Sequence, residues 1–313
     1  MKPNLKSFPL LLGISSAVIA VFCQSINDVA IKFLSGGYAL HQVVLVRSSI
    51  GLAILLAVIL PFSNGWRSFK TRRIKFHILR GCLVFFANIT FFLGLAALPL
   101  AEGVAIFFIS PMLITLFSVV FLQEAVGFRR WMAIILGLLG VIIMLRPGIS
   151  TFQFAALLPF LAAFGYASVQ VLTRYIGRTE TAVTMSLYSQ ITFIVASGLF
   201  GLVLGDGRFE GNSDPSLLFL FRAWSLPAPE DYVIFISLGC VSALGSFFVS
   251  QAYRASEAAF IAPIEYIALP LAIMWGVLVF GHWPDFTALI GIALILGSGL
   301  YMIWRETRTA LNM

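Results

Sequence analysis

Long, continuous apolar runs dominate this chain of 313 residues. Hydrophobic residues make up 60% of it and charged residues only 11%, and runs of about 20 apolar residues are typical of membrane helices. The runs do not alternate between apolar and polar residues, which favours helices over the strands of a barrel. We therefore predict an all-α membrane protein with ten transmembrane helices. Their expected ranges are 9–34, 43–62, 76–98, 101–122, 130–145, 152–174, 183–204, 231–253, 258–280 and 286–304.

The second half of the sequence repeats the first in the same order. The segment 124–144 has a counterpart at 282–302, an offset of 158 residues. Five helices in each half is an odd number, so the second copy would lie inverted in the membrane, as in many secondary transporters. We expect two five-helix repeats, 1–147 and 148–313, divided where proline and glycine end the fifth helix. The same offset also pairs Ala97 with Ala255, Ala101 with Ala259, and Ile106 with Ile264.

Positive charge is distributed unevenly over the predicted loops. With the N-terminus in the cytoplasm, fourteen of the 20 lysines and arginines fall inside, three fall outside and three lie within spans. This asymmetry predicts that both termini are cytoplasmic, with loop 63–75 inside and loop 205–230 outside. Lipid headgroups and topology explain the basic loop 63–75 better than nucleic acid does, so we expect the bilayer as a partner and no nucleic acid.

Several functional classes lack their sequence signatures. No phosphate-binding loop is present, which argues against an ATP-driven pump, and no histidine or cysteine spacing suggests a metal site. A membrane-embedded enzyme would need a paired nucleophile and base on facing helices, and no such group stands out. We therefore expect no catalytic residue, no cofactor and no metal.

Charged residues within spans are costly in lipid and normally face a cavity inside the protein. Asp28 and Lys32 are four residues apart on one helical face, and Arg47 begins the second helix at a similar depth. Two interpretations remain open. The three charges form a gate or substrate anchor, or they form a structural ion pair that holds the first two helices together, with Lys32 extending outward.

Glu265 lies in the ninth apolar run between Pro263 and Pro270. Two prolines interrupt the helix and free backbone carbonyls, which is tolerated where protein or a cavity satisfies them. The carboxylate could bind a cation or a substrate amine, or carry a proton, and Tyr266 beside it could contribute. The alternative is a buried partner for Arg254 or Lys32.

Neutral polar residues within spans complete the candidate site. Most of them are expected to join helices, and two or three to contact the substrate. Small residues such as Gly137 and Gly140 favour packing within one monomer over a homodimer interface. The full set of substrate-binding or gating candidates is Asp28, Lys32, Arg47, Asn88, Gln251, Glu265 and Tyr266.

The end of the first repeat resembles the drug/metabolite transporter superfamily, in its ten-helix branch with two EamA-type repeats. The resemblance rests on Phe121-Leu122-Gln123-Glu124 followed by Trp131 and a glycine-rich helix. The second repeat departs from the pattern, with His282 where glutamate is usual. The resemblance implies alternating access around a central cavity, in the cell inner membrane and without ATP.

A further resemblance concerns bacterial metabolite importers, which include riboflavin transporters and S-adenosylmethionine uptake carriers. It is carried by Asp28-x-x-x-Lys32 with Gln42 and Arg47, by Pro263-x-Glu265-Tyr266, and by the closing segment 301–306. It implies uptake of a small metabolite, with riboflavin as the first expectation. Uptake of S-adenosylmethionine or another metabolite, and export of drugs or amino acids, are the alternatives.

Overall fold

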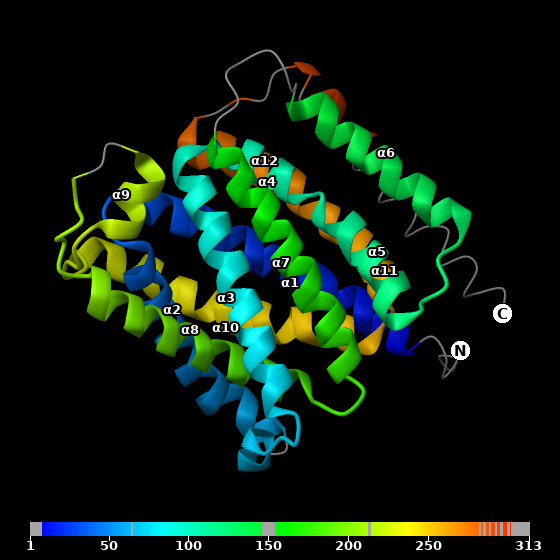
Figure 1. Ribbon diagram of the computed structural model, residues 1–313, viewed down its shortest axis with the longest axis horizontal. Helices are drawn as coiled ribbons and strands as arrows, with labels where there is room; N and C mark the ends of the chain where they lie inside the picture. The colour runs from blue at the N-terminus through cyan, green and yellow to red at the C-terminus, as the bar shows by residue number, and fades with distance from the viewer. Residues whose placement is uncertain are drawn as a thin grey trace.

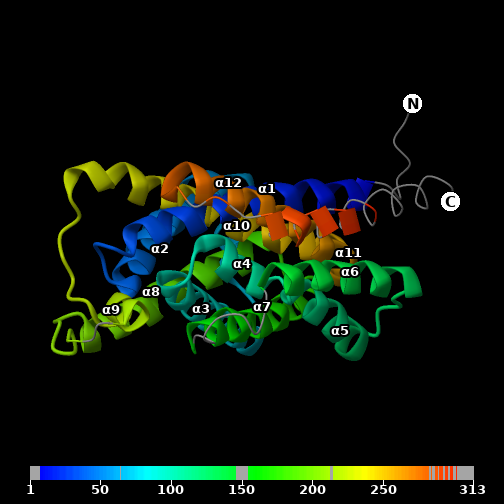
Figure 2. The same cartoon turned by 90° about the horizontal axis from the view of Figure 1, so that it is seen from above.

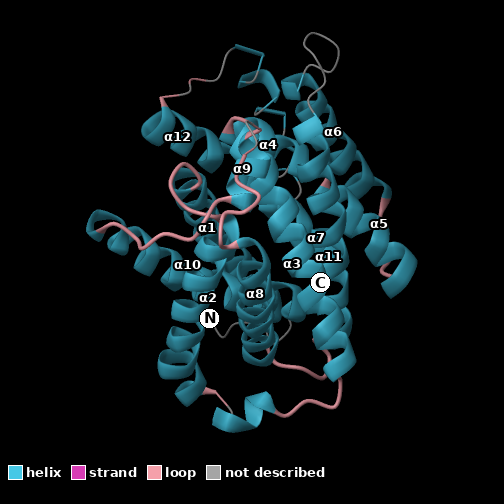
Figure 3. Cartoon of the chain, turned by 60° about the vertical axis from the view of Figure 1, so that its left-hand side comes forward, coloured by secondary structure: helices cyan, strands magenta, loops and turns pink. Residues whose placement is uncertain are grey.

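The computed structural model describes residues 8–63, 65–145, 154–211 and 214–281, with short stretches between 283 and 301. All regular structure in these ranges is helical, which confirms the predicted all-α class (Figures 1 and 3). The elements are α1 (Phe8–Leu34), α2 (Leu40–Ile54), η1 (Leu55–Ile59), η2 (Leu60–Phe62), η3 (Gly65–Phe69), α3 (Ile74–Ala97), α4 (Leu100–Phe107), α5 (Ser110–Leu122), α6 (Phe128–Leu145), η4 (Phe154–Ala156), α7 (Leu157–Ile176), α8 (Ala182–Leu204), α9 (Pro215–Phe221), η5 (Pro229–Asp231), α10 (Tyr232–Ala255), α11 (Ala258–Ile261), η6 (Ala262–Ile267) and α12 (Ala268–Phe280).

Eight helical segments of the described residues are long and apolar enough to cross a membrane, so this is a multi-pass membrane protein. They correspond to the first four and the sixth to ninth predicted helices. The fifth predicted helix is α6, whose apolar part, Trp131–Gly140, is shorter. About half of the tenth, 286–304, lies outside the described residues, so the total of ten stays a prediction. The eight segments are Leu11–Leu34, Leu40–Ile59, Ile74–Ala97, Leu100–Leu122, Leu157–Ile176, Ala182–Leu204, Pro229–Ala255 and Ala258–Phe280.

Two of these segments are broken helices with matching ends. The first begins after Pro99 and the second after Glu257, both with extended backbone (φ −55° and −58°). The first ends at Gln123 and the second at Gly281, both left-handed (φ 56° and 69°). Glycine adopts this conformation freely, whereas Gln123 is the one non-glycine residue with positive φ in the described part of the chain. The start of the second segment therefore lies 158 residues after the start of the first, and the same offset separates their ends.

Each broken helix also changes course at a comparable point. The first is interrupted between α4 and α5, just before Pro111, and the second passes through η6, which contains Pro263. Proline lacks a backbone N–H and cannot continue the hydrogen-bonding of the preceding turn. The breaks follow from these prolines.

Helices from the two halves of the chain pack directly against one another. Helix α1 contacts α10 and α12, α2 contacts α8 and α10, and α3 contacts α7 and α8. Figure 2 shows α1, α10 and α12 along one side of the molecule, with α3, α5 and α7 along the other. Each side therefore combines helices from both halves of the chain.

Close approach of α3 to α7 depends on a glycine. A Cβ atom at Gly94 would lie 2.5 Å from Cδ of Pro159. In lipid, association of helices relies on such close packing because no hydrophobic drive acts between them.

We predict that Gly94→Ala lowers the stability of the detergent-purified protein, by about 1–3 kcal/mol, because the added methyl group overlaps Pro159. Gly198→Ala is the matched control, since a Cβ there meets no atom within 4 Å and alanine favours the helix. Thermal unfolding followed by size-exclusion chromatography measures both variants. Equal melting temperatures for the two would contradict the close packing of α3 on α7.

Candidate functional site

A cavity of about 180 Å³ lies between the N-terminal and C-terminal halves. This is far more than the ~10–15 Å³ that one water molecule occupies. Helices α1, α2, α3 and α4 supply one part of its wall, and α7, α8, α10 and η6 supply another. Its polar and charged lining residues include Gln24, Asn27, Asp28, Arg47, Arg80, Asn88, Tyr166, Gln170, Ser189, Ser242, Ser246, Tyr253 and Glu265, and its phenylalanines are Phe91, Phe92, Phe107, Phe108 and Phe193.

Arg47 is held in the wall by amides. Its Nη1 donates to Oδ1 of Asn27 at 2.5 Å and its Nη2 to Oδ1 of Asn88 at 2.8 Å. The guanidinium carbon also lies 5.8 Å and 5.2 Å from the ring centroids of Phe92 and Phe193, within cation–π range. Neutral groups from α1, α3 and α8 thus stabilise a cation that α2 brings into the membrane.

Asp28 lines the cavity near this group. Its Oδ1 accepts a hydrogen bond from Nδ2 of Asn27 at 3.3 Å, so Asn27 contacts both Asp28 and Arg47. The candidates Asp28, Arg47 and Asn88 are therefore brought together in one wall of the cavity.

Lys32 has a different environment from the one that we considered. Its Nζ donates to the carbonyl oxygens of Leu95 and Leu98 at 2.6 and 2.7 Å, at the end of α3, where carbonyls lose their helical partners. No ion pair joins it to Asp28 among the described residues, so a pair between Asp28 and Lys32 does not form. Lys32 instead attaches α1 to the C-terminus of α3.

Glu265 is positioned by the broken helix. Its Oε1 accepts hydrogen bonds from the hydroxyls of Tyr166 and Tyr253, each at 2.7 Å. The alternative of a partner in Arg254 or Lys32 is therefore wrong. Two tyrosines, from α7 and α10, hold this carboxylate at the cavity wall.

Two other candidates lie away from the cavity. Tyr266 is 2% exposed, packs 5.5 Å from the ring of Phe108, and has no hydrogen-bond partner for its hydroxyl within the described residues. Gln251 lines a separate groove with Val58 and Arg254. Of the seven candidates, Asp28, Arg47, Asn88 and Glu265 therefore share the cavity, and Lys32, Gln251 and Tyr266 do not.

Arg80 of α3 also lines the cavity and is 3% exposed, although it is not among the seven residues predicted from the sequence. It donates to the hydroxyls of Thr173 (2.7 Å), Ser189 (2.6 Å) and Ser250 (3.1 Å), and to the carbonyl of Met185 (3.0 Å). All four partners belong to the C-terminal half. The sequence could have indicated Arg80, because it is a charged residue within a predicted transmembrane helix, as Arg47 is.

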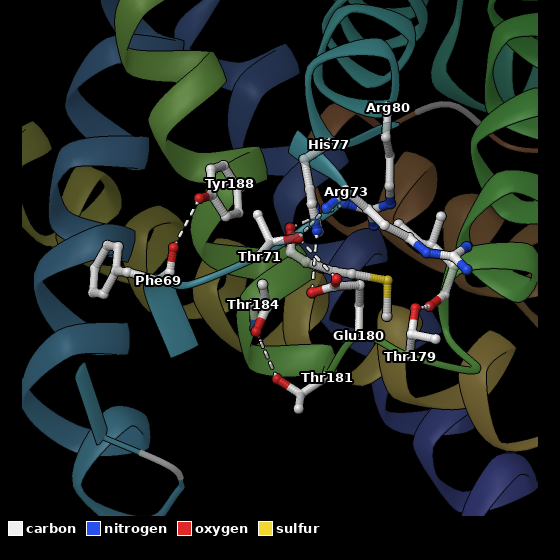
Figure 4. Close-up of polar contacts among 12 residues, drawn as sticks. Phe69, Thr71, Arg73, His77, Arg80, Thr179, Glu180, Thr181, Thr184 and Tyr188 are labelled. Carbon is white, nitrogen blue, oxygen red and sulfur yellow. Dashed lines mark hydrogen bonds and ion pairs between the residues drawn. The ribbon is translucent and has the colours of Figure 1, made fainter. Parts of the chain in front are cut away.

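A cluster around Glu180 joins the halves at the end of the molecule that carries the basic loop (Figure 4). Its Oε1 accepts from Thr71 Oγ1 at 2.8 Å, and its Oε2 lies 3.4 Å from Nε2 of His77. Its carbonyl accepts from Nε of Arg254 at 3.0 Å. Residues of α3, of the loop before it and of α10 thus meet at Glu180.

Glu124 makes a second connection at this end. Its carboxylate lies 3.3 Å from Nε of Arg174 and accepts from the backbone N–H groups of Ala258 and Ala259, both at 3.3 Å. A carboxylate is favoured at a helix N-terminus because the N–H groups there lack helical acceptors. Glu124 thus fixes the start of α11. His282, at the corresponding position, lies outside the described residues.

The opposite end is covered by the segment that follows α8. Nε1 of Trp224 donates to Nδ1 of His41 at 2.6 Å, and Ser225 exchanges two hydrogen bonds with Gln42. The hydroxyl of Tyr38 donates to Asp231 at 2.6 Å, and this bond raises the pKa of the Tyr38 phenol. Backbone and side chains of the C-terminal half therefore close this end over the start of α2.

Comparisons with known proteins agree with this architecture. Residues 11–146 match the model of the EamA-like transporter family. The riboflavin transporter of Vibrio cholerae is 32% identical over 264 residues, covering 82% of this chain and 81% of that protein. The S-adenosylmethionine uptake transporter of Rickettsia felis is 26% identical over 308 residues, covering 98% and 97%.

One solved structure, titled "Crystal structure of protein", superposes with a TM-score of 0.71 over 97% of this chain and 99% of its own. At 17% sequence identity it shows the fold alone. The family match and the curated relatives together show that this chain is a membrane transporter and not an enzyme, and that it belongs to the EamA-like transporter family.

Proposed function

We propose that this protein takes up riboflavin across the cell inner membrane by alternating access. The observation that carries the proposal is a single cavity that combines phenylalanine walls with buried hydrogen-bonding groups. Pockets of this kind suit a flat, largely apolar ligand with a few polar atoms. The isoalloxazine ring of riboflavin would pack on the aromatic walls, and its ribityl hydroxyls would bind amides and charged groups.

The transport cycle in this proposal uses two inverted repeats, 1–147 and 148–313. The matching ends of the two broken helices, 158 residues apart, support this division. In many transporters, interrupted helices at corresponding positions of two repeats mark the substrate site. Glu265, on one interrupted helix, lines the cavity.

Alternating access would open the two ends in turn. The contacts of Glu180 with Thr71 and His77, and those of Glu124 with the start of α11, would separate on the cytoplasmic side. Those of Trp224 with His41 and of Ser225 with Gln42 would separate on the outer side. Each set crosses from one half of the chain to the other, so each would break when the halves rotate apart.

S-adenosylmethionine is the competing substrate, because relatives that cover nearly the whole chain carry that name. The carboxylates of Asp28 and Glu265 in the cavity wall would suit its sulfonium and amino groups. Both substrates can be offered to the same preparation.

We expect proteoliposomes that contain the purified protein to accumulate riboflavin above protein-free vesicles. Riboflavin fluorescence measures uptake, and labelled S-adenosylmethionine is tested in parallel. Accumulation of S-adenosylmethionine with no movement of riboflavin would reject the flavin and leave the uptake mechanism in place.

We predict that Glu265→Gln folds normally and loses at least about tenfold in uptake. The amide oxygen can still accept from Tyr166 and Tyr253, so the change removes charge and little else. Tyr266→Phe is the control, since its hydroxyl lies outside the cavity lining. Uptake per molecule of membrane protein is measured for both. Normal uptake by Glu265→Gln would remove Glu265 from the transport site.

The topology follows from the charge asymmetry and can be tested with single cysteines in a background where the three native cysteines are serines. A cysteine at Gly211, in the loop after α8, should react with a membrane-impermeant maleimide added outside intact cells. A cysteine at Lys70 should react only after the membrane is opened. Both positions are exposed, so the reverse labelling pattern would contradict the proposed orientation.

A further inference from the structure

One face of α7 carries three polar side chains, one of which contacts Arg80. Tyr166, Gln170 and Thr173 follow one another at spacings of four and three residues, which places them on a single helical face. Tyr166 and Gln170 line the cavity, and Thr173 accepts from Nε of Arg80. This face and Arg80 therefore form one continuous part of the cavity wall.

Gln170 leaves an acceptor unused in this wall. Its side chain is 1% exposed, and Oε1 has no hydrogen-bond donor among the described residues. The side chain is held in place by a hydrogen bond with the hydroxyl of Tyr166, which itself donates to Glu265. Buried polar atoms are almost always paired, so an unpaired acceptor on a residue that lines the cavity of a transporter is suited to a ligand N–H.

Arg80, which lines the same cavity, supplies a donor. A guanidinium has five N–H groups, and four of them have acceptors in the described residues. One N–H of Nη2 remains, and none of the four acceptors is a carboxylate. Thr173 and Ser189 donate their own protons to the carbonyls of Val169 and Met185, so their oxygens hold the guanidinium in position.

We propose that Gln170 and Arg80 form a subsite for the edge of a planar heterocycle that presents an N–H beside a carbonyl oxygen. The N–H donates to Oε1 of Gln170, and the carbonyl accepts from Nη2 of Arg80. The pyrimidine ring of a flavin has such an edge in its N3–H and the adjacent carbonyls. The proposal rests on riboflavin as substrate and orients it, with the ribityl chain toward Arg47 and Asn88.

Binding of riboflavin and of N3-methylriboflavin to the purified protein, followed by quenching of flavin fluorescence, tests the subsite. The methyl group removes the N–H, so the wild type should bind the methylated flavin at least about tenfold more weakly, since Oε1 is then left buried and unpaired. Gln170→Met keeps the length of the side chain and removes the acceptor. We expect it to bind riboflavin about tenfold more weakly and to bind both flavins within about twofold of each other.

Gln190→Met is the matched control. Gln190 is also 1% exposed and donates to Ser242, but it does not line the cavity, so this variant should discriminate like the wild type. Gln170→Glu retains an oxygen acceptor and should keep the preference for riboflavin even if Gln170→Met is poorly folded. Loss of preference in Gln170→Glu, or a full preference in Gln170→Met, would overturn the subsite.

Binding of the two flavins to the wild type distinguishes a failure of the subsite from a failure of the proposed function. Equal affinity for the two flavins would reject the subsite and leave riboflavin transport in place. Failure of the wild type to bind either flavin would reject the substrate, and the subsite with it.

Discussion

The free-energy cost of placing charge inside a membrane explains how the residues around the central cavity are arranged. Three buried ionisable groups in the cavity wall are held by neutral partners: Arg47 by two amides and two rings, Arg80 by three hydroxyls and a carbonyl, and Glu265 by two tyrosines. A charge that binds neutral groups keeps hydrogen bonds but is not cancelled by an opposite charge. Arg80 and Glu265 therefore remain able to attract a polar substrate, whereas Arg47 shares its wall with the carboxylate of Asp28.

The sequence predicts the membrane class and part of the site because both follow from residue type and depth. Asp28, Arg47, Asn88 and Glu265 were identified by the cost of polar groups in lipid, and all four line the cavity. The same rule applies to Arg80, which was counted within a span but not selected. Tyr166 carries no charge, and its role depends on Glu265, which lies 99 residues away in sequence, so no local pattern could identify it.

The remaining errors concern the direction in which a side chain points. Gln251 and Tyr253 are two positions apart on α10, yet one faces a lateral groove and the other the cavity, because two residues span more than half a helical turn. The partners of Lys32 are carbonyl oxygens at the end of α3. Every residue has a backbone carbonyl, so residue types cannot indicate which carbonyls a lysine will bind. The spacing of Asp28 and Lys32 therefore suggested an ion pair that does not form.

Neutral partners also suit a carrier that must change conformation when empty. A guanidinium or carboxylate left without hydrogen bonds after substrate release would be strongly destabilised in the closed cavity. Glu265 accepts both of its hydrogen bonds from tyrosines of its own half, so in the proposed cycle it keeps them when the halves of the empty carrier move. In the proposed subsite, a substrate adds bonds at unused positions such as Oε1 of Gln170. In this arrangement, hydrogen bonds within the protein offset most of the free-energy cost of burying its charges. The additional hydrogen bonds made by the substrate then distinguish the loaded carrier from the empty one.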